Sequence, residues 1–149
     1  MQSQWHNLPT FDGVQQLPGA EYAAKDVITT DYSITAELAG AYPPIKGLRS
    51  YRRSVLVDED GITLQDMTGW KGTVELTLLT EQEPTPVWNG FAVGTLGGIR
   101  FDPEHVQAEV TPVPVTDPRL RTAWPEKIYK ITLHFKKNLY LELYDEGEE

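Results

Sequence analysis

The sequence YKITLHFKKNLYLELY, residues 129–144, decides the fold class. Its apolar side chains stand at every second position, on both sides of a polar turn at Lys137-Asn138: Tyr129, Ile131, Leu133, Phe135, Leu139, Leu141 and Leu143. Successive side chains of a β-strand point to opposite faces, so this period gives each strand one buried and one solvent-facing side. The stretch predicts two antiparallel strands, and the short turn predicts that they pair as a hairpin.

The same period of two residues continues toward the N-terminus, over residues 32–38, 62–67 and 73–78. The dipeptide Asp60-Gly61 suits a hairpin turn, and Gly97-Gly98 predicts another between strands at 91–96 and 99–101. Residues 81–86 and 111–118 are predicted connections, because proline donates no hydrogen bond to a sheet. Helical spacing is confined to a window too short to hold a helix. The predicted fold is all-β, an antiparallel two-sheet β-sandwich.

The chain has the length of one ordinary domain, 149 residues, and we expect a single β-sandwich domain over residues 1–149. Its first residues, MQSQWHN, have neither capping nor tail character. We therefore expect the C-terminal part of a longer protein. The sequence shows no signal peptide and no apolar run of the roughly 20 residues that span a membrane, so its localisation stays open.

The composition excludes several classes of partner and chemistry. Thirteen Lys and Arg against 22 Asp and Glu give a net charge of -9, which disfavours nucleic acid and anionic membrane surfaces as partners. Cysteine is absent, so disulfides, thiol nucleophiles and cysteine-type zinc sites are excluded. No serine-hydrolase, zincin or phosphate-loop motif occurs. The carboxylate pairs Asp58 with Asp60 and Asp102 with Glu104 lie in predicted turns, where local hydrogen bonding accounts for them.

Few residues remain as candidates for binding. His134 is predicted to be an exposed strand residue and His105 a surface turn residue, whereas His6 stands between Trp5 and Asn7 ahead of a turn. Arg52 and Arg53 belong to the densest basic stretch, and such arginines pair either with sugar carboxylates or with the protein's own acidic residues. Exposed tryptophans can stack on sugar rings. Arg52, Arg53 and Trp5 are the predicted substrate-binding residues.

Two stretches resemble a known family. QWHNLPTFDGVQQ, residues 4–16, resembles the start of the C-terminal β-sheet region of the heparinase II/III-like polysaccharide lyases. YRRSVLVDEDGITLQD, residues 51–66, is similar to a strand pair of the same family, in which an Arg-bearing strand precedes a hairpin and an Asp-ending strand.

The resemblance implies the C-terminal domain of an enzyme that cleaves uronic-acid-containing glycans by β-elimination. It implies an upstream α-helical toroid as partner, an acidic polysaccharide as substrate, and a cleft of which this chain forms one wall. The family's catalytic residues lie upstream, so the isolated chain is not expected to be catalytic alone. His6 matches a position that, where zinc is present, joins upstream ligands around it. One imidazole cannot hold zinc, so no cofactor is expected for this chain alone.

A second interpretation is a non-catalytic carbohydrate-binding or scaffolding β-sandwich that shares only the architecture, because fold does not fix function.

Overall fold

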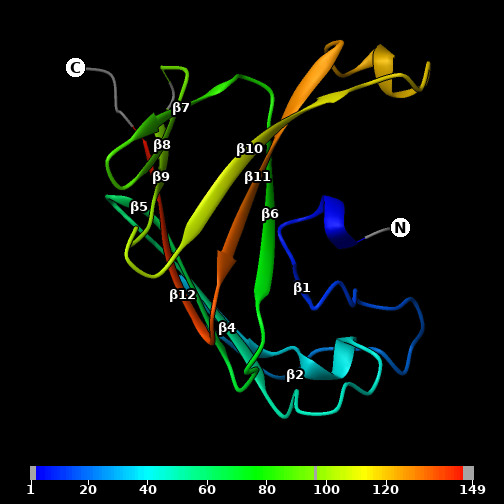
Figure 1. The fold of residues 1–149 in the computed structure, drawn as a ribbon. Coiled ribbons are helices and arrows are strands. Elements are labelled where there is room, and N and C mark those ends of the chain that lie inside the picture. The colour runs from blue at the N-terminus through cyan, green and yellow to red at the C-terminus, as the bar shows by residue number, and fades with distance from the viewer. Residues whose placement is uncertain (1–2, 96, 146–149) are drawn as a thin grey trace.

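A computed structural model describes residues 3–95 and 97–145 and shows two antiparallel β-sheets packed face to face (Figure 1). The predicted fold class is therefore confirmed. Among the described residues, no helix is long and apolar enough to cross a membrane.

The smaller sheet has four strands in the order β1-β6-β11-β10. They are β1 (Pro9–Phe11), β6 (Val74–Thr80), β11 (Lys127–Phe135) and β10 (Gln107–Pro114). The larger sheet has eight strands in the order β2-β3-β4-β5-β12-β9-β8-β7. They are β2 (Lys25–Thr29), β3 (Ser33–Glu37), β4 (Tyr51–Asp58), β5 (Gly61–Thr68), β12 (Asn138–Asp145), β9 (Gly97–Arg100), β8 (Gly90–Val93) and β7 (Pro84–Val87). Three short 3-10 helices lie outside the sheets: η1 (Ser3–Trp5), η2 (Ala39–Ala41) and η3 (Leu120–Thr122).

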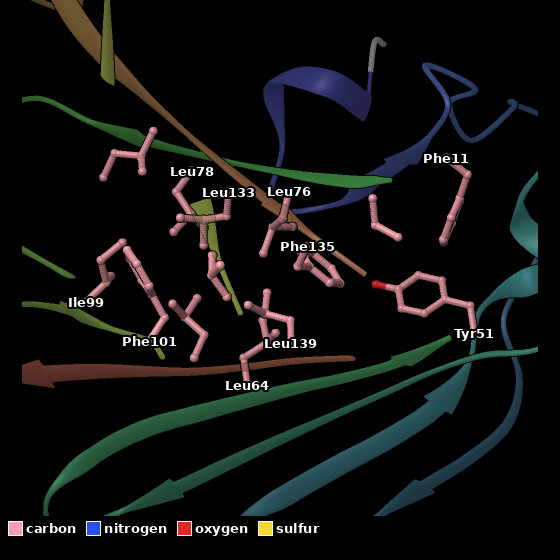
Figure 2. Packing of buried hydrophobic residues seen from close by; sticks show 14 of the residues in the cluster. Phe11, Tyr51, Leu64, Leu76, Leu78, Ile99, Phe101, Leu133, Phe135 and Leu139 are labelled. Atoms are coloured by element: carbon pink, nitrogen blue, oxygen red, sulfur yellow. The ribbon is translucent and has the colours of Figure 1, made fainter. Parts of the chain in front are cut away.

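The hydrophobic core fills the space between the sheets (Figure 2). On β11 the buried apolar residues are those that the two-residue period assigned to one face: Tyr129, Ile131, Leu133 and Phe135. On β6, Val74, Leu76 and Leu78 are buried in the same way. The alternation in the sequence therefore identified the inner face of both strands.

The predicted hairpin at Lys137-Asn138 is wrong. β11 pairs with β6 and β10 in the smaller sheet, whereas β12 pairs with β5 and β9 in the larger one. The chain crosses between the sheets at this turn, where Lys137 adopts a φ of 62° and its carbonyl accepts a 2.7 Å bond from the Thr68 amide. Alternation shows which side of a strand is buried but not which strand lies beside it. Two successive strands that line one core from opposite sheets carry the same pattern as a hairpin.

The second predicted hairpin is confirmed, because β8 pairs antiparallel with β9. Its turn lies before Gly97-Gly98 and not at them, since both glycines lie within β9 and pair with Val93 and Ala92. Glycine is needed here because the backbone of a neighbouring strand comes too close to leave room for a side chain. A Cβ atom at Gly98 would collide with the Phe91 carbonyl oxygen. Glycine inside a strand has this use as well as its use in turns.

The two proline-bearing stretches predicted as connections contain strands. Residues 84–87 form β7 and residues 107–114 form β10. Each of these strands lies at an edge of its sheet, with a neighbour on one side only. An edge strand needs backbone donors toward that one neighbour, so proline is tolerated there and excluded from central strands.

We predict that Leu76→Ala lowers the free energy of unfolding by about 2–5 kcal/mol, because it leaves a cavity in the core. Leu76 is 0% exposed on the central strand β6. Chemical denaturation followed by circular dichroism measures the change. A loss below about 0.5 kcal/mol, which is usual for surface positions, would contradict this packing.

Candidate functional site

The candidate site is the corner formed by Trp5, the last residue of η1, and by His6 and Asn7, which follow it before β1. Its position depends on β1, which has only three residues and pairs with β6 at the edge of the smaller sheet. All three residues of β1 are buried. The few backbone hydrogen bonds of so short a strand stabilise it little. Side chains packed around β1 must therefore hold it in position.

An aromatic cluster surrounds Phe11 at the end of β1. The Phe11 ring lies 5.0 Å from Tyr42, 5.6 Å from Tyr51 and 6.0 Å from Trp70 between ring centroids. All three contacts are edge-to-face, the arrangement that ring quadrupoles favour. Phe11 and Tyr51 lie close together in Figure 2, at one end of the core. The cluster anchors β1 to the start of β4.

A buried ion pair fixes the chain just before β1. Asp66 of β5 is 0% exposed, and its carboxylate accepts two 2.7 Å bonds from Nε and Nη2 of Arg53 on β4. The remaining guanidinium nitrogen of Arg53, Nη1, donates to the carbonyl oxygen of Asn7. One guanidinium therefore neutralises the buried carboxylate and holds the residue that follows His6. Two-pronged pairing of this kind is the strong form of a carboxylate contact.

Two tyrosines complete this network. The Tyr51 hydroxyl donates to both oxygens of Asp66 at 3.2 Å, and the Tyr42 hydroxyl donates to the Pro9 carbonyl at 2.6 Å. Burial is the main cause that raises the pKa of each phenol, and the nearby Asp66 charge adds to it. Both tyrosines therefore stay neutral hydrogen-bond donors. Burial alone would lower the pKa of Arg53, but its bonds to Asp66 raise it overall.

The His6 side chain is exposed. Within residues 3–95 and 97–145, its ring makes no hydrogen bond, and only its backbone carbonyl is engaged, by the Leu8 amide at 2.7 Å. The same part of the chain holds no group of three or more His, Cys, Asp or Glu residues that could bind a metal ion. The role of His6 as one zinc ligand stays a prediction.

The structure separates the two predicted substrate-binding arginines. Arg52 and Arg53 are neighbours on β4, so they point to opposite faces of the larger sheet. Arg53 reaches the corner through Asn7, whereas Arg52 is exposed beside Glu37 of β3. Trp5 lies in the corner, 38% exposed. Binding of a substrate by any of the three stays a prediction, and Arg53 already has an internal acidic partner.

Sequence reasoning missed Tyr42 and Asp66. A signal for Asp66 exists, because it follows the apolar Leu64 at the two-residue spacing and so shares its buried face. An acidic residue at an apolar-face position predicts a buried charge that needs a partner. Arg53 stands directly opposite in the register of β4 and β5. Tyr42 lies in an irregular segment, where no periodicity indicates its contacts.

The remaining acidic and histidine candidates have local explanations. Asp58 accepts a 3.0 Å bond from the Asp60 amide, and Asp102 accepts one of 2.9 Å from the Glu104 amide, as expected in turns. This backbone bond, with a second bond from His105, lowers the pKa of Asp102. His105 is exposed, as predicted, whereas the His134 side chain, 28% exposed, is partly covered.

Comparison with known proteins gives a likeness in structure but none in sequence. No protein-family model matches the chain, and no curated protein does. Among solved structures, a mutant of the heparan sulfate lyase HepC from Pedobacter heparinus has a similar fold, with a TM-score of 0.62 and 13% sequence identity. The likeness covers 99% of this chain and 25% of that chain. The chain therefore shares its fold with a segment of that lyase and spans about a quarter of its length.

We predict that Arg53→Ala destabilises the chain by about 3–5 kcal/mol, because it leaves the Asp66 carboxylate buried without a counter-charge. Arg52→Ala, on the exposed side of the same strand, is the matched control and should change the free energy of unfolding by less than about 0.5 kcal/mol. Urea denaturation of both variants gives the comparison. Equal effects at the two positions would show that the Arg53–Asp66 pair does not carry this stability.

We predict that His6→Ala leaves the free energy of unfolding within about 0.5 kcal/mol of the wild type, because the side chain is exposed. The same urea titration measures it. A loss of several kcal/mol would instead identify His6 as a structural residue and would remove it from the candidate site.

Proposed function

We propose that this chain is the C-terminal β-domain of a polysaccharide lyase of the heparinase II/III-like type. In this proposal it forms one wall of the substrate cleft and is not catalytic alone. The observation that carries the proposal is the structural likeness, which extends over 99% of the chain to a segment of a heparan sulfate lyase. The sequence resemblance at residues 4–16 and 51–66 supports it independently.

The corner of Trp5, His6 and Asn7 is the part of the chain that we assign to the cleft. β-Elimination at a uronic acid needs a base for the C5 proton, an acid for the leaving oxygen and a polar group beside the carboxylate. The network of Arg53 and Asp66 holds the backbone of the corner, while His6 remains exposed. The fold therefore does not depend on the exposed His6 side chain, which is available, together with Trp5, to contact a glycan.

The catalytic base and acid belong, in this proposal, to an upstream α-helical toroid that docks beside the corner. The solved lyase is about four times as long as the segment that this chain matches. His6 could contribute one imidazole to a zinc site completed by that partner, where the metal would polarise or hold polar groups near the substrate. An acidic polysaccharide would lie between the two walls.

A non-catalytic carbohydrate-binding or scaffolding sandwich is the second candidate function. It is favoured by exposed tryptophans such as Trp124, which is 45% exposed, because indole rings stack on sugars without any catalytic group.

The test is a lyase assay on the product of the complete open reading frame and on the 149-residue chain. Heparan sulfate, heparin, hyaluronan and alginate are the substrates, and absorbance of the unsaturated uronide is the readout. We expect product from the complete protein, less product from its His6→Ala variant, and none from the isolated chain. Glycan binding without product by the complete protein would favour the second function. Turnover by the isolated chain would contradict the assignment of the catalytic groups to another domain.

A further inference from the structure

A groove of about 600 Å³ runs beside the candidate site on the outer face of the smaller sheet. Its floor consists of Leu79, Val113 and Ile128, from three adjacent strands. Because Tyr129 and Ile131 point into the core, Ile128 must point to the opposite face, and Val113 is its register partner. The volume lies in the range of small-molecule sites.

Trp5 and His6 form one rim of the groove. The ammonium nitrogen of Lys130, from the outer face of β11, lies 5.5 Å from the centroid of the Trp5 ring. A cation at this distance interacts favourably with the indole face. This end of the groove therefore combines an aromatic surface with one positive charge.

The loop between β10 and β11 forms the other rim, through Leu120 and Trp124. Their side chains are 51% and 45% exposed. The Trp124 amide donates a 2.8 Å bond to the Leu120 carbonyl, and Arg121 donates a 3.0 Å bond to the Trp124 carbonyl. Figure 1 shows this loop and η1 on the same side of the smaller sheet. These bonds hold the backbone of the loop at Trp124.

The charges of the groove limit what it can bind. Its lining residues include no Lys or Arg: Trp5, His6, Asn7, Leu79, Val113, Pro114, Val115, Thr116, Asp117, Leu120, Trp124 and Ile128. The single carboxylate, Asp117, already accepts a 2.8 Å bond from the Arg119 amide. Proteins often bind sulfate and phosphate groups through arginine and lysine side chains, because a paired charge offsets the loss of hydration of the anion. Lys130 at the Trp5 end supplies a single ammonium group, which can pair with one carboxylate. A sugar that carries several sulfate groups would leave most of its charges without a partner here.

We propose that this groove binds unsulfated sugar units of a uronic-acid-containing glycan, with sugar rings stacked on Trp5 and Trp124. The apolar floor and the indoles suit the CH faces of sugar rings, while Asn7, Thr116 and Asp117 offer hydrogen bonds to hydroxyl groups. Lys130 is placed to meet a uronate carboxylate at the Trp5 end. This inference rests on the proposed function and adds that the sugar units bound in the groove are unsulfated.

The test is calorimetric titration of the 149-residue chain with two hexasaccharides of equal length, N-acetylheparosan and heparin. We expect N-acetylheparosan to bind more tightly, with less than a threefold change in Kd when sodium chloride rises from about 50 to about 300 mM, since few ionic contacts form. Trp124→Ala and Trp5→Ala should each weaken its binding at least tenfold. Trp88→Ala is the matched control, because Trp88 is 84% exposed outside the groove and should leave Kd unchanged.

A converse variant keeps the inference falsifiable if the alanine variants lose structure. Thr116→Lys adds a cation to the exposed loop and should raise the affinity for heparin in a salt-dependent manner. Preferential heparin binding by the wild type would overturn the inference. So would binding that both tryptophan variants retain, no binding of either glycan, or a Trp124-dependent dimer in sedimentation. Each of these results is separate from the lyase assay, whose failure would reject the proposed function instead.

Discussion

The buried ion pair between Arg53 and Asp66 is the interaction on which the arrangement of the candidate site depends. A carboxylate that is 0% exposed is very costly in the interior without a partner. Arg53 supplies that partner, and the geometry of its guanidinium leaves one nitrogen for the carbonyl of Asn7. The requirement to neutralise Asp66 therefore also determines where the chain enters β1. Tyr51 and Tyr42 add neutral donors to the same cluster.

This constraint links the core of the sandwich to its outer surface. β1 is the edge strand of the smaller sheet, and Phe11 packs inward while Trp5 and His6 stay on the outside. The groove beside them is built from three strands of that sheet and from a loop with internal hydrogen bonds. A fixed corner next to a preformed aromatic groove suits the binding of an extended, weakly charged chain better than a mobile loop would.

The fold class could be predicted from the sequence because the two-residue period of β6 and β11 reflects burial directly. The partners of the strands could not, since β12 carries the pattern of a hairpin partner yet pairs in the other sheet. Two strands were not predicted in full because their residues are unusual for strands. Proline occurs in β10 because this strand lies at an edge of its sheet, and glycine occurs in β9 because the neighbouring backbone comes close. At the site, the motif around His6 indicated the corner. The opposite orientation of Arg52 and Arg53 follows from the alternation of side chains along one strand and could have been predicted. The groove could not, because it also needs the loop of Trp124, which lies more than 100 residues from Trp5 in the sequence.

The claim that the corner and groove face a glycan is tested most directly by hydrogen exchange of the chain with and without N-acetylheparosan hexasaccharide. The account predicts slower exchange of amides in residues 5–8 and 115–124 when the sugar is bound, because ligand contacts suppress local opening there. It predicts no change in residues 84–93, which form β7, β8 and the turn between them on the other sheet. Protection confined to the outer face of the eight-stranded sheet, with residues 5–8 and 115–124 unaffected, would contradict it.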